Sequence, residues 1–393
     1  MNNFIKYNSS VSSDFFDSDI QKNFGLLSNC IKNKKILVIG GAGTIGSNYI
    51  KQILNFKPNS IFVVDHNENG LTELTRDLRS SKYLDYNPEY LTYPVNLLSD
   101  TFERLFEKNN FDIISNFSAL KHVRSEKDIV SVEALIKNNI YGAIKLLELC
   151  LKKPPKFLFS VSTDKATNPV NIMGASKLIM EKIIISHKNK LRVSTARFAN
   201  VSFSNGSLLD GFTNRLKKSQ PLSCPEDIKR FFVSEEQSGK ICLLSTFLGE
   251  SGDIFFPKLD SMRHQIYFKD IAINFLEKNG YEPIIVKSEN EAKNFKKESP
   301  KQYPILMFKS DTSGEKKFEE FYSVNDNFIL DDLSSLGIIK NKVIGLNLAS
   351  IKNDFDQVFK NLKSTKNDII KVINKLLPNF NHIEKGKNLD SKM

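Results

Sequence analysis

The residues of this chain that are best suited to chemistry stand together in the segment Ser162-Thr-Asp-Lys-Ala166, directly after an apolar run. Asp164 and Lys165 place a carboxyl group next to an amine, and Thr163 adds a hydroxyl. Neighbouring groups of this kind can serve as general acid and general base, because burial and mutual charge move their pKa values apart. In an arbitrary protein we would interpret them as a surface charge pair. Here the motifs on either side favour a catalytic role.

A second pair follows on the next predicted helix. Met173 and Lys177 are four residues apart, so they share one helix face. Most oxidoreductases with this layout carry a tyrosine four residues before the helical lysine, whose phenol moves a proton while the lysine holds the cofactor ribose. The thioether of Met173 cannot titrate. In a redox enzyme with this sequence, proton transfer must therefore fall to Thr163, Asp164 and Lys165.

The bulk properties indicate a globular protein with an excess of positive charge. The net charge of the 393 residues is +11, but lysines are spread along the chain, which favours a solvated surface and no nucleic-acid partner. Cys30, Cys150, Cys224 and Cys242 are too scattered for a metal site or a redox pair, so we expect no metal. Residues 1–13 are too polar for a signal peptide, and no apolar run approaches the roughly 18 residues of a membrane span. We therefore expect a cytoplasmic protein without membrane insertion.

The elements that must position these residues alternate regularly between strand and helix. Six apolar runs read as strands: Ile36–Ile39, Ile61–Val64, Tyr90–Val95, Asp112–Phe117, Phe157–Val161 and Leu191–Arg197. Apolar strands without polar alternation, each followed by a helix, are typical of a parallel sheet covered on both faces. The sequence therefore predicts an α/β fold with a doubly wound parallel sheet of the Rossmann type.

We divide the chain into four predicted parts. They are an N-terminal helical extension (1–34), a dinucleotide-binding domain (35–200), a smaller substrate-binding lobe interleaved with the core (201–342), and a C-terminal helical extension with a polar tail (343–393). One helix is expected in the first part, from the spacing of Ile20, Phe24, Leu27 and Ile31. The polar end after residue 383 is expected to be disordered. The additional helices favour contacts between subunits, so we expect a homo-oligomer.

A glycine-rich segment, Gly40-Gly-Ala-Gly43-Thr-Ile-Gly46, follows the first predicted strand and opens a helix. A tight turn and the close approach of backbone amides to a pyrophosphate both require residues without a Cβ, and the helix N-terminus adds partial positive charge. Asp65 ends the second strand, where its carboxylate can accept hydrogen bonds from the adenosine ribose and repel a 2′-phosphate. NAD is therefore favoured over NADP. The predicted ligands in the loop are Gly40, Gly43, Thr44, Ile45 and Gly46.

Further candidates follow the third and fourth predicted strands, at the carboxyl edge where ligands lie in doubly wound sheets. Asn96, Ser118 and Ala119 are predicted to lie close to the cofactor. Lys121 and His122 can face a substrate, although a solvated loop charge and a structural histidine are the alternatives.

Two polar residues near this edge keep two interpretations each. Arg124 is either a substrate contact or a solvated loop charge. Asn139 either fixes backbone groups near the site with a buried amide or occupies a plain polar helix position.

Together these motifs resemble the extended short-chain dehydrogenases and, within them, the nucleotide-sugar 4,6-dehydratases that act on UDP-N-acetylglucosamine. The resemblance spans about Lys35 to Tyr322. Members with methionine in place of tyrosine resemble the bacillosamine-type and O-antigen dehydratases, and this chain looks like a soluble relative of that branch. The motifs that carry the resemblance are the glycine loop, Ala119-Leu-Lys-His-Val123, Ser162-Thr-Asp-Lys-Ala166 with Asn168-Pro169, Gly174-Ala-Ser-Lys177, Arg197 to Val201, Arg230-Phe-Phe232 and Gly314-Glu-Lys316.

The resemblance implies a redox-neutral loss of water for surface glycan biosynthesis, with NAD regenerated at the end. Sugar C4 is oxidised to a ketone that acidifies the C5 proton, Lys165 removes that proton, Asp164 protonates the departing C6 hydroxyl, and a hydride returns to C6. Our own hypothesis is that Asp164, with Thr163 as relay, first accepts the proton of the 4-hydroxyl. Met173 and Lys177 complete the predicted catalytic group, and Lys177 also holds the cofactor.

The resemblance also indicates how a UDP-sugar substrate is held. Asn200 matches a family asparagine that contacts the sugar or diphosphate, whereas Arg197 can equally be structural. Arg230 is a predicted diphosphate ligand, since a guanidinium makes forked hydrogen bonds to phosphate oxygens. Glu315 is predicted to bind the uridine ribose, and its alternative is an acid favoured by a helix dipole.

Two other functions suit the same fold. A nucleotide-sugar 4-epimerase also keeps NAD bound, but it ordinarily needs the phenolic base, so Met173 and the Asp164–Lys165 pair count against it. A non-catalytic NAD-sensing protein would tolerate the loss of tyrosine without any substitute acid or base. The presence of Thr163, Asp164, Lys165 and Lys177 argues against that function.

Overall fold

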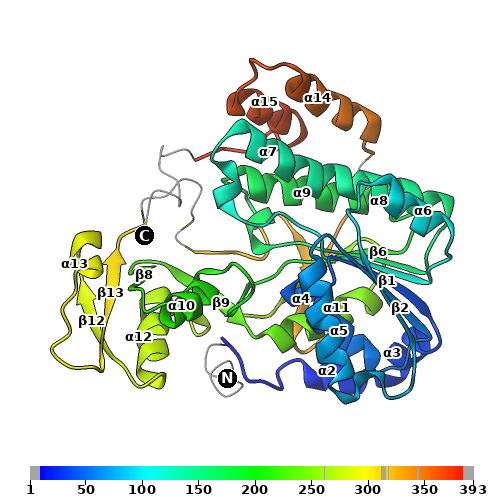
Figure 1. The fold of residues 1–393 in the computed structure, drawn as a ribbon. Helices are drawn as coiled ribbons and strands as arrows, with labels where there is room; N and C mark the ends of the chain where they lie inside the picture. The colour runs from blue at the N-terminus through cyan, green and yellow to red at the C-terminus, as the bar shows by residue number, and fades with distance from the viewer. Residues whose placement is uncertain (1–8, 261, 311–315, 317, 343–344, 384–393) are drawn as a thin grey trace.

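A nine-stranded sheet forms the centre of the protein, with the order β14-β15-β10-β6-β5-β4-β1-β2-β3 (Figure 1). The computed structural model describes residues 9–260, 262–310, 316, 318–342 and 345–383. Neighbouring strands run parallel from β3 to β10, and β15 and β14 complete one edge in antiparallel pairing. The strands are β1 (Lys35–Ile39), β2 (Ser60–Asp65), β3 (Glu89–Pro94), β4 (Ile113–Asn116), β5 (Phe157–Val161), β6 (Val193–Ala196), β10 (Asp253–Pro257), β14 (Asn327–Ile329) and β15 (Leu336–Lys340).

Helices cover both faces of this sheet, which confirms the predicted doubly wound architecture. Successive residues of β1 belong to different core clusters, Ile36 to one and Leu37 to the other, because side chains alternate across a strand. One face carries α3 (Phe24–Ile31), α4 (Thr44–Leu54), α5 (Glu68–Arg79) and α11 (Glu235–Phe247), with η1 (Lys82–Leu84) nearby. The other carries α6 (Asp100–Glu107), α7 (Ile129–Ile136), α8 (Gly142–Lys152) and α9 (Ile172–Ile185).

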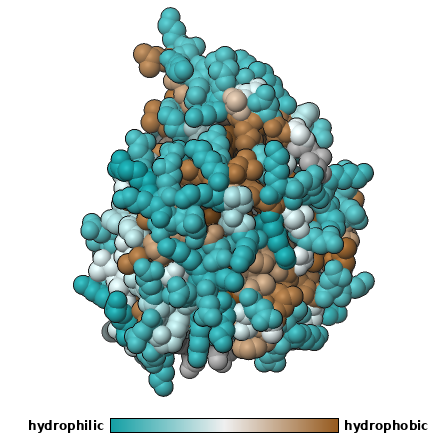
Figure 2. All heavy atoms as spheres, turned by 90° about the vertical axis from the view of Figure 1, so that its right-hand side faces the viewer, coloured by the Kyte–Doolittle hydropathy of each residue, from teal (hydrophilic) through white to brown (hydrophobic). Residues whose placement is uncertain are grey.

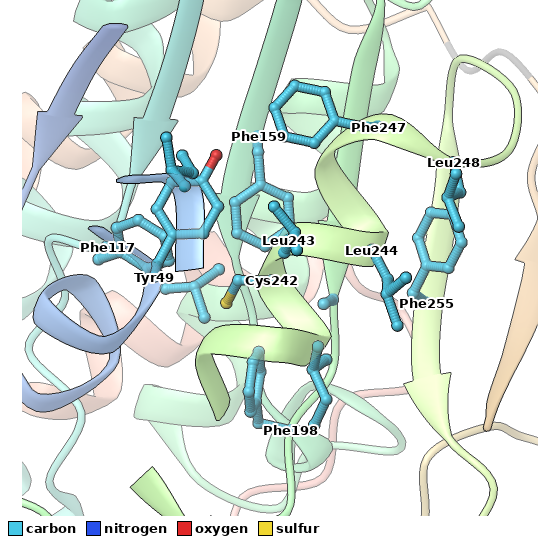
Figure 3. Packing of buried hydrophobic residues seen from close by; sticks show 14 of the residues in the cluster. Tyr49, Phe117, Phe159, Phe198, Cys242, Leu243, Leu244, Phe247, Leu248 and Phe255 are labelled. Atoms are coloured by element: carbon cyan, nitrogen blue, oxygen red, sulfur yellow. The ribbon is translucent and has the colours of Figure 1, made fainter. Parts of the chain in front are cut away.

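Aromatic side chains fill the core beneath α11. Figure 3 shows Tyr49, Phe117 and Phe159 gathered beside Cys242, and the Tyr49 hydroxyl is hydrogen-bonded to the Ser115 hydroxyl at 2.7 Å. Helices α4 and α11 approach closely at Gly239, where a Cβ atom would lie 2.5 Å from a backbone oxygen of α4. This packing fixes the helix that the glycine loop opens.

Residues 201–342 contribute to a smaller lobe and also return to the main sheet through α11, β10, β14 and β15. The lobe contains two three-stranded sheets, ordered β11-β9-β7 and β12-β13-β8. Its elements are β7 (Asn200–Val201), α10 (Leu208–Lys217), β8 (Leu222–Pro225), β9 (Lys229–Val233), β11 (Gln265–Tyr267), α12 (Phe268–Lys278), β12 (Glu282–Val286), α13 (Glu289–Lys293) and β13 (Gln302–Phe308).

The N-terminal extension differs from the sequence expectation. A single helix was expected through residues 20–31, but the chain forms α2 (Asp17–Lys22) and α3 with a break at Asn23, and Phe24 is 55% exposed. Asp19 explains the attachment of α2, because its buried carboxylate accepts hydrogen bonds from the amides and hydroxyls of Ser334 and Ser335.

The C-terminal extension packs on the face that carries α7 and α9 (Figure 1). It forms α14 (Leu348–Lys360) and α15 (Lys366–Leu376), while the predicted polar tail after residue 383 lies outside the described residues.

None of the helices in the described parts of the chain is both long enough and apolar enough to cross a membrane. Figure 2 shows hydrophilic side chains over much of one face, with apolar patches between them.

Candidate active site

The glycine-rich loop joins β1 to α4 and needs its glycines for different reasons. Gly40 has φ +73°, and a Cβ there would lie 2.6 Å from the amide nitrogen of Ser118. A Cβ at Gly46 would lie 2.4 Å from the Gly40 carbonyl oxygen, so the helix could not approach the turn. At Gly43 the nearest described atom would be 3.4 Å away. The fold itself therefore requires Gly40 and Gly46, whereas Gly43 leaves room beside the helix N-terminus that begins at Thr44.

Asp65 lies beside this loop, at the end of β2. Its two carboxylate oxygens accept hydrogen bonds from the amides of Ala42, at 3.1 Å, and Asn67, at 3.0 Å. The adjacent His66 side chain is mostly exposed. The carboxylate thus holds the loop against the second strand, where the sequence predicted a ribose ligand.

The segment after β4 is held from behind by a π-helical turn, η3 (Lys137–Tyr141). The buried Asn139 amide accepts from the backbone N–H of Leu120 and donates to its carbonyl, both at 3.0 Å, and it also donates to the Ser176 hydroxyl at 2.9 Å. The Ser118 hydroxyl donates to Asn138 at 3.3 Å. Of the two interpretations of Asn139, the structure shows the one in which its amide fixes backbone groups.

The other predicted ligands of this edge are more open. Lys121 and His122 are exposed, and a Cβ at Gly206 would lie 3.1 Å from the His122 ring, so this loop meets the lobe. Asn96 is exposed and accepts a hydrogen bond from Leu98 at 2.8 Å. Asn200 is partly buried and donates to the Phe231 carbonyl at 3.4 Å. The segment 116–122 lies next to the glycine loop, whereas Asn200 comes from β7 of the lobe.

The predicted acid–base residues form a cluster at η4 (Asp164–Ala166), just beyond β5, in which Asp164 is buried and Thr163 and Lys165 are partly buried. Asp164 is 2% exposed, and its Oδ1 accepts from the Thr163 hydroxyl at 2.8 Å, the Lys165 amide at 2.9 Å and the Lys165 ammonium at 3.2 Å. Its Oδ2 is buried and has no hydrogen-bond partner among the described residues. A buried carboxylate oxygen without a partner is costly in free energy, which suits an atom that meets a substrate group.

A second buried carboxylate, which the sequence reasoning missed, completes this cluster. Glu319 is 5% exposed, and its Oε1 lies 3.2 Å from Lys165 Nζ and 3.2 Å from Arg230 Nε. Its Oε2 is also buried without a hydrogen-bond partner in the described part of the chain. The Lys165 ammonium thus lies between the carboxylates of Asp164 and Glu319.

The charges of this cluster set its protonation. Burial and the charge of Glu319 raise the pKa of Asp164 above its ordinary value, against the opposing effect of Lys165. Burial disfavours the ammonium form of Lys165, but the charges of Asp164 and Glu319 outweigh burial and raise the pKa of Lys165. Burial likewise disfavours ionised Glu319, but Lys165 and Arg230 outweigh it and lower the pKa of Glu319. The resting site therefore holds an ammonium at Lys165 and an aspartate that accepts protons more readily than usual.

Arg230, the predicted diphosphate ligand, is held by protein groups in this structure. Its guanidinium is buried, and besides Glu319 it donates to the carbonyls of Lys229 at 2.8 Å and Lys316 at 3.0 Å. In this arrangement each of the three Arg230 nitrogens contacts a protein group and holds the segment around Glu319, and its role as a diphosphate ligand stays a prediction. The predicted ribose ligand Glu315 lies outside the described residues.

Arg197 is structural, as one of its two interpretations held. Its Nε and Nη2 donate to the buried Glu181 at 3.1 and 2.9 Å, and its Nη1 donates to Thr167 at 3.0 Å and to the Phe321 carbonyl at 2.8 Å. This pair connects β6 and α9 to both segments that carry the acid–base cluster.

Met173 and Lys177 lie on α9 as predicted, but both are buried. Met173 belongs to an apolar core cluster, and its backbone N–H donates to Glu126 at 2.8 Å. Lys177 Nζ donates to the Val161 carbonyl at 2.7 Å, and burial lowers the pKa of Lys177 to about 8 despite the nearby charge of Glu181. Met173 therefore offers no group for proton transfer, and Lys177 connects α9 to the end of β5.

Other chemistry has little support in the described residues. No group of histidine, cysteine, aspartate and glutamate side chains in these residues could hold a metal ion. Cys150, Cys224 and Cys242 are buried thiols, and Cys30 is partly buried.

The strand order, the glycine loop and the position of Asp65 define a Rossmann-type protein of the extended short-chain dehydrogenase class. Residues 36–326 match the polysaccharide biosynthesis protein family, and the chain belongs to this family. This confirms the predicted family, while its methionine branch stays a prediction.

Three known proteins illustrate the similarity. The chain is 35% identical over 263 residues to the uncharacterized membrane protein MJ1061 of Methanocaldococcus jannaschii, covering 65% of this chain and 76% of that protein. It is 28% identical over 311 residues to an inverting UDP-N-acetylglucosamine 4,6-dehydratase of Campylobacter jejuni, covering 77% and 86%. The structure of Pen from Bacillus thuringiensis has the same fold, with a TM-score of 0.64 at 23% identity, covering 81% of this chain and 89% of Pen.

Proposed function

We propose that this protein is a nucleotide-sugar 4,6-dehydratase that uses NAD and converts UDP-N-acetylglucosamine to a 4-keto-6-deoxy product for surface glycan biosynthesis. The observation that carries the proposal is the contact of Thr163 and Lys165 with the buried Asp164 carboxylate beyond β5, on the sheet edge that also carries the glycine loop. Such a cluster supplies the acid and base that an elimination requires on neighbouring carbons. The Campylobacter relative carries the same activity in its name.

The glycine loop fits the cofactor of this proposal. Gly43 leaves room at the N-terminus of α4, where backbone N–H groups and the helix dipole favour a pyrophosphate. Asp65 stands at the end of β2, where its carboxylate can also accept hydrogen bonds from ribose hydroxyls. Bound NAD would accept a hydride from the sugar and return it. Lys177 donates to the Val161 carbonyl at the end of β5, and its contact with the cofactor ribose stays a prediction.

The geometry of the cluster supports a proposed order of proton transfers. Asp164 accepts the proton of the sugar 4-hydroxyl through Thr163, whose hydroxyl lies 2.8 Å away, and the raised pKa of Asp164 suits this role. Asp164 then gives that proton to the C6 hydroxyl, which leaves as water. Lys165 removes the C5 proton, and C5 gains a proton again when the hydride returns to C6. Because Lys165 rests as an ammonium, it must lose a proton before it can act as this base.

The proposal is tested by incubating the purified protein and NAD with UDP-N-acetylglucosamine and following the product by mass spectrometry. We expect a product lighter by one water. A product of unchanged mass with inverted C4 would instead identify a 4-epimerase, the activity in the name of a Rickettsia bellii relative that is 28% identical over 257 residues. Retention of NAD without any product would favour the NAD-sensing alternative.

Two parts of the sequence interpretation stay predictions. We propose a cytoplasmic location, which the buried free thiols support because such thiols suit a reducing compartment. Homo-oligomerisation is also proposed, and the apolar side chains exposed on α3 are compatible with a subunit contact. Sedimentation of the purified protein tests the second point, and a monomer at micromolar concentration would contradict it.

A further inference from the structure

Glu319 has no role in the proposed function, although it occupies the centre of the acid–base cluster. One of its oxygens is shared by Lys165 and Arg230, each at 3.2 Å, and the other is buried without a partner among the described residues. Burying a carboxylate costs free energy, and ion pairs recover that cost only when their geometry is good. A stability role alone would be satisfied by the Arg230 pair. The second contact, to Lys165, brings Glu319 into the chemistry.

We propose that Glu319 is a positioning residue for Lys165, which fixes the ammonium beside Asp164 and sets how readily this lysine gives up its proton. The inference rests on the proposed function, because it assigns Lys165 the role of base. In this arrangement Glu319 acts through Lys165 and does not itself exchange protons with the substrate.

The charged groups around Glu319 determine the direction in which Glu319 shifts the protonation of Lys165. Asp164, Lys165, Arg230 and Lys316 are the described charges that act on this centre. The negative charges of Asp164 and Glu319 favour the ammonium form of Lys165, while Arg230 opposes it. Removal of the Glu319 charge must therefore favour the neutral amine.

The matched control is the next residue along the chain. Glu320 carries the same charge, but its carboxylate lies 3.3 Å from the Asn168 amide and 4.0 Å from Lys316 Nζ, and its side chain is 43% exposed. Glu319→Gln and Glu320→Gln thus remove one charge each from the same segment. Only the first removes a contact with Lys165.

The first measurement is independent of catalysis. Trace acetylation of the folded protein by acetic anhydride, read at Lys165 by mass spectrometry across a pH series, reports the pH at which this amine becomes neutral. We expect the midpoint to fall by about 1 to 3 pH units in Glu319→Gln, since opposite charges at this separation shift pKa values by that amount. Each unit corresponds to about tenfold more neutral amine at a fixed pH. Glu320→Gln should leave the midpoint in place.

Activity provides the second measurement. If Lys165 must be neutral to act, kcat/KM rises with pH as the amine loses its proton. This rising limb of the pH profile should move to lower pH in Glu319→Gln. Glu319→Asp keeps the charge but moves it farther from Lys165, because the side chain is shorter. The labelling midpoint of this variant should therefore lie between those of the wild type and Glu319→Gln. Should Glu319→Gln fail to fold, the labelling midpoint of Glu319→Asp still has to lie below that of the wild type.

An unchanged midpoint in folded Glu319→Gln, or in Glu319→Asp if only that variant folds, would overturn the inference. A lower rate without any movement of the limb would assign Glu319 a purely structural role and would overturn it as well. If the wild-type protein released no water from the sugar, the proposed function would fail, but the labelling experiment would still decide what Glu319 does to Lys165.

Discussion

The two ends of the candidate site are constructed in different ways. At the cofactor end, the turn after β1 is shaped by backbone and by missing side chains, since a Cβ at Gly40 or Gly46 would collide with backbone atoms within 3 Å. At the acid–base end, the geometry is set by the charges of Asp164, Lys165 and Glu319 within a buried space. A steric site tolerates changes of pH and salt, whereas a charged one changes with the protonation of each member.

The comparison also concerns distance along the chain. The cofactor loop is one continuous segment that contacts the ends of the two neighbouring strands, β2 and β4, but the acid–base cluster combines residues from η4, β9 and the segment that follows residue 315. A contiguous site can form as soon as its strand and helix pair. A dispersed site depends on the packing of the lobe against the main sheet, so its geometry is expected to respond to changes far from the chemistry.

The largest effect is expected at the charged end. Asp164→Asn keeps the volume of the side chain but removes the proton acceptor, and loss of acid–base catalysis should lower kcat by about 10²- to 10⁴-fold. Neither C4 oxidation nor water loss should then be detected by mass spectrometry. Lys165→Ala should instead stop after C4 oxidation and leave a 4-keto sugar that retains its C6 hydroxyl. Full turnover by Asp164→Asn would refute the assigned role.

At the steric end, two alanine substitutions should separate folding from ligand binding. Gly46→Ala places a methyl group 2.4 Å from the Gly40 carbonyl, and we expect a loss of about 1 to 3 kcal/mol in the free energy of unfolding without ligand. Gly43→Ala meets nothing closer than 3.4 Å and should leave this free energy nearly unchanged while weakening the affinity for NAD. Urea unfolding and calorimetric titration measure the two quantities. Equal destabilisation by both variants would contradict the comparison.

An effect of similar size is expected at the segment after β4, next to the glycine loop. Asn139→Ala leaves the N–H and carbonyl of Leu120 without their buried partner, which should cost about 1 to 3 kcal/mol of unfolding free energy. Asn138→Ala removes a weaker contact at 3.3 Å and serves as the control in the same turn. Denaturant unfolding compares the two, and a larger loss at residue 138 would show that the Leu120 contact is not the important one.

The most gradual effect is a dependence of stability on pH at Lys177. Its folded pKa of about 8 lies below the ordinary value of 10.5, so between these pH values the unfolded chain binds more protons than the folded chain. Stability should therefore rise with pH in this window, by at most about 1.4 kcal/mol per pH unit. Lys177→Met should lose this rise, while Lys182→Met, at a partly exposed position of the same helix, should keep it. Parallel stability curves for the wild type and Lys177→Met would exclude this explanation.

Much of the fold could be predicted from the sequence, because local patterns determine it. The six predicted strands all form, with ends that differ by at most two residues, since short apolar runs between helical stretches favour strands in a sheet covered on both faces. The N-terminal helix was predicted less well. Its apolar spacing continues through Asn23, but Asp19 is held by Ser334 and Ser335 from a distant loop, and such a tertiary contact leaves no local pattern.

The parts of the site that lie close together in the sequence were predicted better than the parts that join distant segments. The glycine loop, Asp65 and the Thr163–Lys165 segment lie where the sequence placed them, because each follows a strand directly. Glu319 was missed, and its ion pair with Arg230 was not predicted, because this pair joins segments far apart in the sequence. A signal for Glu319 was present in the family motif at residues 314–316, which lies just before it, but the motif alone does not say which acid reaches the lysine.

The π-helical turn η3 holds one residue more than an α-helical turn, and this has a consequence for the length of the chain there. The added residue lets two successive side chains, Asn138 and Asn139, reach the same loop. Deleting one residue would restore ordinary α-helical winding and rotate Asn139 by about 100° around the helix axis, away from Leu120. This stretch should therefore accept changes in residue type at its exposed positions more easily than any change in residue number.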